Sequence, residues 1–89
     1  MIAVIWKPEK NEELKKDPTR PSFDDVLEAI AEGGYRDVLR NKNHPDQVVL
    51  VVMIQGYAHA VPCRILGTLM FLRTVFPSRI LQKTYGGRK

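Results

Sequence analysis

The 89-residue sequence has a single cysteine, Cys63, and two histidines, so it offers neither an internal disulfide nor the ligand spacing of a zinc site. Long apolar runs are also missing. The longest, residues 48–54, has seven residues, whereas a membrane-spanning helix needs about 20. The chain turns charged at Lys7, and no long apolar segment follows a basic start, which argues against a secretory signal. We therefore expect a cytoplasmic protein with no metal, no cofactor and no membrane contact.

Acidic residues are missing from the second half of the chain. Residues 1–46 carry eight Lys and Arg and all ten Asp and Glu, a net charge of −2, whereas residues 47–89 carry six Lys and Arg, a net charge of +6. A wholly cationic half attracts polyanions, because each Lys or Arg placed on a phosphate releases condensed counterions. Nucleic acid or an acidic protein surface is the expected partner; the alternative is a merely solvated basic surface.

The length fits one domain with one modest core. We assign residues 1–85 to this domain and residues 86–89 to a flexible basic tail. Apolar runs between turn signals predict strands at 2–6, 35–39, 47–55, 58–66 and 69–76, the last one ended by Pro77. Helices are expected at 9–16, after Ser22, and from Ser78 to Tyr85.

The clearest helix begins after Ser22, whose hydroxyl can cap free backbone amides, and ends at Gly33 and Gly34. Its apolar residues recur at helical spacing and predict one buried stripe: Phe23, Val26, Leu27 and Ile30. This stripe is the expected cover for one face of a small antiparallel sheet of four to five strands. The fold class is thus α+β, with N-terminal helices and a short C-terminal helix. The other sheet face stays partly open and is the expected docking surface for RNA.

Most of the chain carries, in order, residues typical of one family of bacterial toxins. The first half has Trp6, Pro8, Lys10, Asn11, Leu14, Ser22, Phe23 and Val26. The second half has Asp37, Val38, Leu39, Gln47, Gly56, Tyr57, Val61, Pro62, Phe71, Leu72, Arg73, Thr74, Pro77, Ser78 and Arg79. In their order and spacing these residues resemble the BrnT-type toxins of toxin-antitoxin pairs. The sequence departs from that family in the 17–21 linker, at Cys63 and Arg64, and at Ile80 and Leu81, where more basic residues are common.

The resemblance implies a RelE-like fold, in which helices flank an antiparallel sheet. It implies the toxin of a type II toxin-antitoxin system, a metal-independent endoribonuclease that cleaves mRNA and inhibits translation. It also implies a hetero-oligomer with a cognate antitoxin that carries a DNA-binding ribbon-helix-helix or similar domain. The loss of charge after Arg79 weakens the case for efficient catalysis.

Two readings without catalysis remain open. One is a catalytically silent module that binds RNA or an acidic protein through its basic C-terminal half. The other is a structural subunit that pairs its strands with another chain, which predicts an exposed apolar groove rather than a basic one.

Metal-free RNA cleavage uses the ribose 2′-hydroxyl as nucleophile and needs a base, a proton donor and cations at the phosphate. Arg79, next to Ser78 at the predicted start of the last helix, is the first choice for phosphate binding. Lys83 lies four residues later and points to the same side. The alternative for Arg79 is a surface arginine or a salt bridge to an acid of the first half, and the alternative for Lys83 is a solvated lysine.

The remaining candidates are less specific. Tyr85 either donates a proton or stacks on a base, or else anchors the last helix to the core. His44, in a polar loop, is the candidate general base, although a lone loop histidine often has no catalytic role. Arg64 and Arg73, on neighbouring strands, either add cations to the open sheet face or flank the acidic helix.

The candidate set can be tested by geometry. The catalytic candidates are Arg79, Lys83, Tyr85 and His44, and the RNA-binding candidates are Arg64, Arg73, Ser78, Arg79 and Lys83. If Arg79 and Lys83 converge on one site with His44 or Tyr85, the enzyme is favoured; if they scatter, the binding module is favoured. His59 either faces the same surface as Tyr57 or is a sheet residue whose ring is satisfied by hydrogen bonds. Cys63 is expected to be a small buried hydrophobe.

Overall fold

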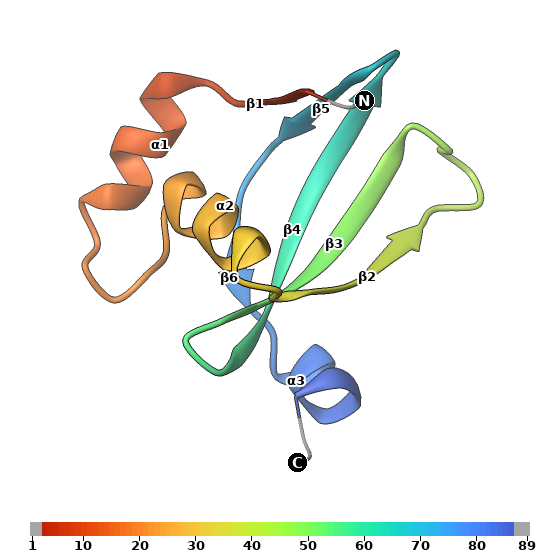
Figure 1. Ribbon diagram of the computed structural model, residues 1–89. Coiled ribbons are helices and arrows are strands. Elements are labelled where there is room, and N and C mark those ends of the chain that lie inside the picture. The colour runs from red at the N-terminus through yellow and green to blue at the C-terminus, as the bar shows by residue number, and fades with distance from the viewer. Residues whose placement is uncertain (1–2, 87–89) are drawn as a thin grey trace.

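The computed structural model describes residues 3–86 as a small α+β domain (Figure 1). The predicted element order is confirmed except that the last strand is divided in two. The bounds are β1 (Ala3–Ile5), α1 (Pro8–Lys15), α2 (Phe23–Ala31), β2 (Tyr35–Arg40), β3 (Gln47–Ile54), β4 (Tyr57–Leu66), β5 (Leu69–Leu72), β6 (Phe76–Pro77) and α3 (Arg79–Tyr85). Among these residues no helix has the length and apolar character needed to cross a membrane. The predicted tail lies outside the described residues, except for Gly86 at the end of α3.

The sheet is mixed, which corrects the prediction of a purely antiparallel sheet. Its strand order is β1-β5-β4-β3-β2, and the four strands from β2 to β5 form the expected antiparallel meander. β1 joins the edge of β5 in parallel, with Val4 beside Met70. The two helices between β1 and β2 carry the chain across the whole sheet, so that these strands lie at opposite edges (Figure 1).

The last predicted strand, 69–76, is not continuous. Leu72 pairs with Cys63 and Phe76 pairs with Ala60, so three residues on this side face two residues of β4. The extra residue is a β-bulge, which interrupts the ladder and divides the strand into β5 and β6. Pro77 was expected to end the strand but is part of β6, opposite His59.

α2 begins as the sequence predicts, with a capping box. The Ser22 hydroxyl accepts a hydrogen bond of 3.3 Å from the Asp25 amide, and the Asp25 carboxylate accepts one of 2.8 Å from the Ser22 amide. The buried residues of the helix are Phe23, Val26 and Ala29, whereas Leu27 is 37% exposed. Leu27 lies about 90° around the helix from the centre of the buried face, so its predicted burial was wrong.

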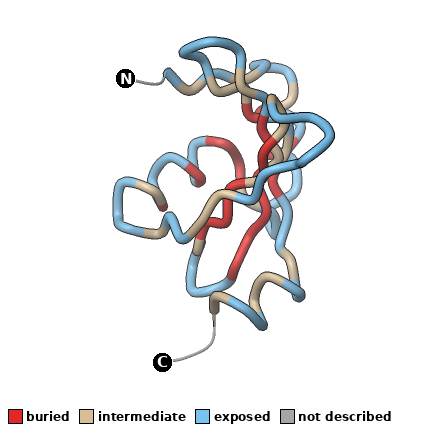
Figure 2. The backbone as a smooth tube through the Cα atoms, turned by 90° about the vertical axis from the view of Figure 1, so that its right-hand side faces the viewer, coloured by how far each residue is buried: buried red, intermediate tan, exposed pale blue. Residues whose placement is uncertain are grey.

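The core lies between α2 and the central strands, where the buried residues concentrate (Figure 2). Leu50 and Val52 of β3 belong to it, and their side chains therefore point toward α2. α1 is held mainly by buried Leu14 and by Asn11, whose side-chain oxygen accepts a hydrogen bond of 2.8 Å from the Phe23 amide. Cys63 is buried in this core as predicted, and burial raises the pKa of its thiol to about 12.

Candidate RNA-binding surface

The sheet face opposite α2 is partly open, as the sequence predicts. Because neighbouring residues of a strand point to opposite faces, the pairing register identifies its members. Val49 and Pro62 are paired and lie on this face, since Leu50 and Val61 belong to the core on the other side. We call this surface the open face. Val51, Ala58 and Ala60 also lie on it but are buried; its exposed or half-buried members include Ile5, Leu39, Val49, Pro62, Arg64, Leu66, Leu69, Phe71, Arg73 and Phe76.

The open face is largely apolar, and several of its large side chains are exposed. Leu66 is 45% exposed and Phe76 is 40% exposed, and Ile5, Leu39 and Leu69 lie just below these values. Exposed aromatic rings are the platforms on which unpaired RNA bases stack. The same exposure also fits the apolar groove expected of a strand-pairing subunit.

A basic groove of about 330 Å³ lies on the open face, lined by Leu39, Arg40, Asn41, Gln47, Val48, Val49, Pro62, Cys63 and Arg73. Its lining contains two arginines and no carboxylate. The backbone amide of Arg73 donates to the Pro62 carbonyl at 2.9 Å, which continues the β5–β4 ladder by one residue. Both arginines are exposed and take part in no salt bridge of residues 3–86. The groove therefore presents cations without a competing negative charge.

The sequence predicted Arg73 for this face but not Arg40. Arg40 belongs to the acidic half of the chain, and a count of charges by halves hides it. The β2–β3 pairing places Arg40 opposite Val48, a core residue, so by strand alternation Arg40 does not share the open face with Leu39; it borders the groove from the end of β2. The signal in the sequence was the predicted hairpin of β2 and β3, because a residue next to its loop pairs with the first residues of the following strand.

Arg64 also lies on the open face but already has a partner. Its Nε is 2.9 Å from a carboxylate oxygen of Asp46, the last acid of the chain. The salt bridge to an acid of the first half, which was the alternative predicted for Arg79, is thus formed by Arg64 instead. Much of its positive charge is compensated, and it is less available to a phosphate than Arg73.

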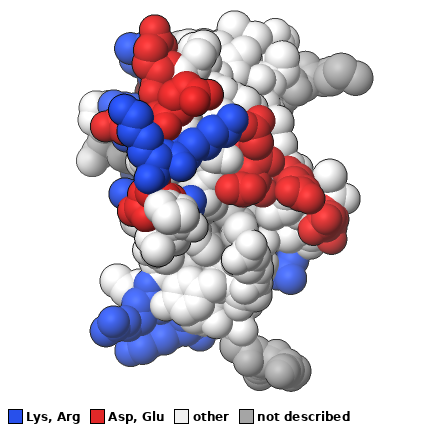
Figure 3. All heavy atoms as spheres, turned by 90° about the vertical axis from the view of Figure 1, so that its left-hand side faces the viewer, with Lys and Arg blue, Asp and Glu red and all other residues white. Residues whose placement is uncertain are grey.

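Arg79 and Lys83 lie on α3, spaced so that both point to one side of the helix. Both are exposed, and none of the salt bridges in the described part of the chain includes either of them. Figure 3 shows Lys and Arg side chains gathered at the α3 end of the molecule, apart from the acidic side chains over α1 and α2. The Ser78 hydroxyl caps α3 by accepting a hydrogen bond of 3.2 Å from the Leu81 amide.

Tyr85 anchors α3 to the edge strand. Its hydroxyl donates a hydrogen bond of 2.7 Å to the carboxylate of Asp37 on β2. This contact raises the pKa of the Tyr85 phenol and lowers the pKa of the Asp37 carboxyl. At neutral pH the phenol is a proton donor already bound to an acceptor, which fits the anchoring alternative.

His44 lies far from α3. Its loop adjoins Gln47, at the start of β3, whereas α3 docks at Ala58, opposite Met53 near the other end of β3. Gln47 and Met53 are separated by about 20 Å along the strand. The structure therefore brings Arg79 and Lys83 onto one surface, holds Tyr85 against Asp37, and places His44 elsewhere.

No protein-family model, curated protein or solved structure matches this chain. The site is thus characterised by its own geometry. Within residues 3–86 no three His, Cys, Asp or Glu side chains are placed to hold a metal ion together. The groups available for chemistry on this surface are the cations Arg40, Arg73, Arg79 and Lys83 and the exposed ring of Phe76.

Proposed function

We propose that this protein is the toxin of a bacterial type II toxin-antitoxin pair and binds mRNA across the open face. The observation that carries the proposal is the groove with Arg40 and Arg73 and no carboxylate in its lining. Each arginine neutralises one phosphate and releases its counterions. Unpaired bases would stack on the neighbouring exposed Phe76. The resemblance of the sequence to BrnT-type toxins, which implies a RelE-like fold, supports the same reading.

In this proposal the protein cleaves the bound RNA without a metal. The ribose 2′-hydroxyl attacks the adjacent phosphorus and the 5′-oxygen leaves, giving a 2′,3′-cyclic phosphate and a new 5′-hydroxyl end. Arg79 and Lys83 would stabilise the charge that develops on the phosphate. Solvent water would take the 2′-hydroxyl proton, Tyr85 would protonate the leaving oxygen once α3 shifts away from Asp37, and the phenol would regain its proton from water.

The proposal includes a cognate antitoxin, of ribbon-helix-helix or similar type, that covers the open face in the cytoplasm. A partner that shields the exposed Leu66 and Leu69 would also remove apolar surface from water. The resulting hetero-oligomer would keep RNA out of the groove.

A catalytically silent RNA-binding module is the second candidate, favoured by one observation. The proposed general base His44 is not at α3, since its loop adjoins Gln47 at the opposite end of β3 from the site where α3 docks, and the Tyr85 hydroxyl is already bound to Asp37. Binding would then block translation without cutting the message.

Induced expression of the wild-type chain separates the candidates, with growth and cellular 5′-hydroxyl RNA ends as readouts. The variant Arg73→Ala and the double variant Arg79→Ala with Lys83→Ala remove unpaired cations, and Lys16→Ala, at an exposed lysine that follows α1, is the matched control. Growth arrest with new ends, lost in the first two variants only, supports the ribonuclease. RNA binding by the purified protein without new ends supports the silent module. The absence of both RNA binding and new ends would contradict both candidates.

A further inference from the structure

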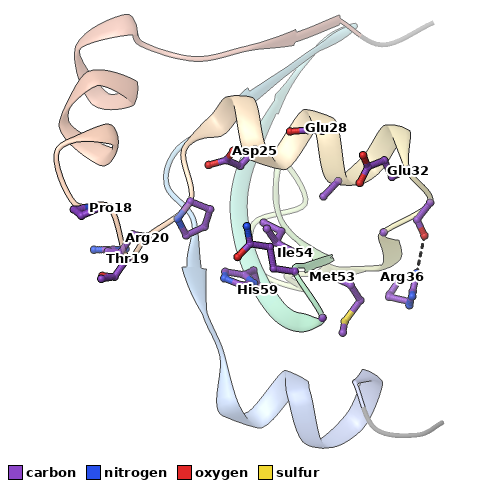
Figure 4. A pocket seen from close by; sticks show the side chains of 16 residues that line it. Pro18, Thr19, Arg20, Asp25, Glu28, Glu32, Arg36, Met53, Ile54 and His59 are labelled. Atoms are coloured by element: carbon purple, nitrogen blue, oxygen red, sulfur yellow. Dashed lines mark hydrogen bonds between the residues drawn. The ribbon is translucent and has the colours of Figure 1, made fainter.

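A second concave site lies on the α2 side of the sheet. A cleft of about 530 Å³ separates α2 from the turn between β3 and β4, within the range of about 300–1,000 Å³ that ligand pockets occupy. In Figure 4, His59 of β4 lies below α2. The charged residues that line the cleft are Asp25, Glu28 and Glu32 along α2, and Arg20 and Arg36 toward its two ends.

The α2 wall of this cleft carries three carboxylates. Asp25, Glu28 and Glu32 follow one another at intervals of three and four residues, so they share one side of the helix. Asp25 is engaged by the Ser22 cap, but Glu28 and Glu32 occur in no salt bridge of the described chain. Both lie toward the C-terminal end of α2, which has no basic residue in its last turn and where the helix dipole is already negative.

His59 adds an acceptor to the opposite wall. It is only 7% exposed, and its Nδ1 donates a hydrogen bond of 2.8 Å to the Tyr57 carbonyl. Nε2 then keeps its lone pair, and it takes part in none of the hydrogen bonds found within residues 3–86. Burial lowers the pKa of His59, which keeps the ring neutral. A nine-tenths buried side chain thus lines the cleft with a free acceptor atom.

The two arginines of the cleft compensate part of this charge, so the three carboxylates leave the lining with an excess of one negative charge. The Arg20 guanidinium donates to the Val75 carbonyl at 2.9 Å, and that of Arg36 donates to the Gly33 carbonyl at 2.7 Å. Each is fixed by a backbone carbonyl near one end of the cleft, and neither forms an ion pair with Glu28 or Glu32 in the part of the chain that is described. The centre of the cleft keeps acceptors on both sides.

The end of the cleft wall after α2 is rigidly built. The Gly34 amide donates to the Ala29 carbonyl at 2.7 Å, and the Gly34 carbonyl accepts from the Met53 amide at 2.8 Å. A Cβ at Gly34 would lie 2.5 Å from the Met53 carbonyl oxygen, so the helix end and β3 are in direct backbone contact. The carboxylates of α2 are thus held at a fixed separation from the strand, which lowers the cost of ordering a ligand.

We propose that this cleft binds the guanidinium group of an arginine side chain presented by a partner polypeptide. Glu28 and Glu32 pair with its charge, and Nε2 of His59 accepts one of its hydrogen bonds. A guanidinium matches the site because its five donors reach acceptors in several directions, whereas an ammonium group is a more compact charge. The site is independent of RNA binding, since His59 and the open face lie on opposite sides of the sheet.

The test is a titration of the full-length protein with N-acetyl-arginine amide, whose only charge is the guanidinium, followed by amide NMR shifts. We expect saturable shifts at Gly33, Gly34 and Gly56, with a dissociation constant of about 1 mM or weaker. Glu28→Gln with Glu32→Gln should weaken binding by about fivefold or more. Glu9→Gln, an exposed glutamate on α1 away from the cleft, is the matched control and should change nothing.

Several outcomes would overturn the assignment. Equal binding of the neutral isostere N-acetyl-citrulline amide would remove the role of charge. Tighter binding of N-acetyl-lysine amide, or of free spermidine, would replace the peptide arginine by another amine. Shifts confined to the open face, or unchanged affinity in the Glu28 and Glu32 variants, would move the site elsewhere. The spectra of the variants report their fold directly, and each single Gln variant repeats the test.

Discussion

The hydroxyl of Tyr85 donates a hydrogen bond of 2.7 Å to the carboxylate of Asp37, across 48 residues of sequence. Two further contacts hold α3 to β4: the Gln82 side chain accepts from the Ala58 amide at 2.8 Å, and the Ser78 amide donates to the Ala58 carbonyl at 3.0 Å. Among the hydrogen bonds of residues 3–86, only the tyrosine contact joins α3 to the edge strand β2. It therefore fixes the orientation of the helix that presents Arg79 and Lys83.

Replacement of Tyr85 by phenylalanine should loosen α3 without unfolding the domain. The variant loses one hydrogen bond between partly exposed groups, while the Gln82 and Ser78 contacts stay. We expect amide exchange in α3 to become several-fold faster and exchange in β3 to stay unchanged, because local opening of a surface helix does not require global unfolding. Hydrogen exchange measured by NMR gives both values. Equal acceleration in α3 and β3 would show that the contact supports the whole fold instead.

The same contact should depend on pH at both ends of the scale. The hydrogen bond from Tyr85 is the largest of the effects that lower the Asp37 pKa below 3.8, so its stabilisation is present above that pH and is lost as pH falls through the lowered pKa. The pKa of Tyr85 is raised above 10.0, so its contribution is present below that pH and is lost as pH rises through the raised pKa.

The carboxyl carbon shift of Asp37, followed through an acid titration, measures the first of these effects. In Tyr85→Phe the midpoint should move back toward 3.8, only in part, because the Val38 amide also donates to Asp37 at 2.8 Å. A midpoint identical in both proteins would mean that the hydrogen bond is not formed in solution.

Local signals in the sequence predicted the elements well, because caps and turns act over a few residues. Ser22 starts α2, and Gly56, with a φ of 79°, occupies a turn position that favours glycine. The parallel pairing of β1 with β5 and the bulge before β6 depend on contacts far apart in sequence, and no local pattern specifies them. The burial of Ala29 in place of Leu27 follows from how α2 turns toward the sheet, which the helical spacing alone leaves open.

The candidate site was predicted less completely than the fold. Arg73, Arg79 and Lys83 are exposed cations as expected, because charge in the second half had no acid of its own half to pair with. Arg40 was missed because its role depends on strand pairing. The significance of His59 was also open, since strand alternation does not tell which face is covered. The charge asymmetry of the sequence becomes an acidic α2 and a largely apolar open face that carries Arg73, with Arg79 and Lys83 on α3.

Alanine at Gly34 should destabilise the protein more than alanine at Gly67. The new methyl group would meet two backbone carbonyl oxygens, at 2.5 Å from Met53 and 2.8 Å from Ala29, and neither can rotate away. We expect a loss of about 2–3 kcal/mol in the free energy of unfolding, as for other overpacked sites. At Gly67 the space is free and only the φ of 63° is unfavourable, a cost of about 1 kcal/mol. Urea unfolding of both variants measures the difference, and equal values would contradict the close contact of α2 with β3.

RNA affinity should depend on salt through the unpaired cations of the open face and α3. Each phosphate contact to a single strand contributes about 0.7 to the slope of log affinity against log salt concentration. Arg73→Ala and Lys83→Ala should each lower that slope by about 0.7. Arg64→Ala should lower it less, because its guanidinium already lies 2.9 Å from Asp46, whose charge the variant leaves uncompensated. The RNA affinity of Arg64→Ala would still fall, because the freed Asp46 carboxylate repels phosphate. A direct phosphate contact therefore lowers both the slope and the affinity, whereas this charge effect lowers mainly the affinity. Binding of a short unstructured RNA measured at several salt concentrations gives both quantities, and equal slopes for all three variants would place the RNA away from this surface.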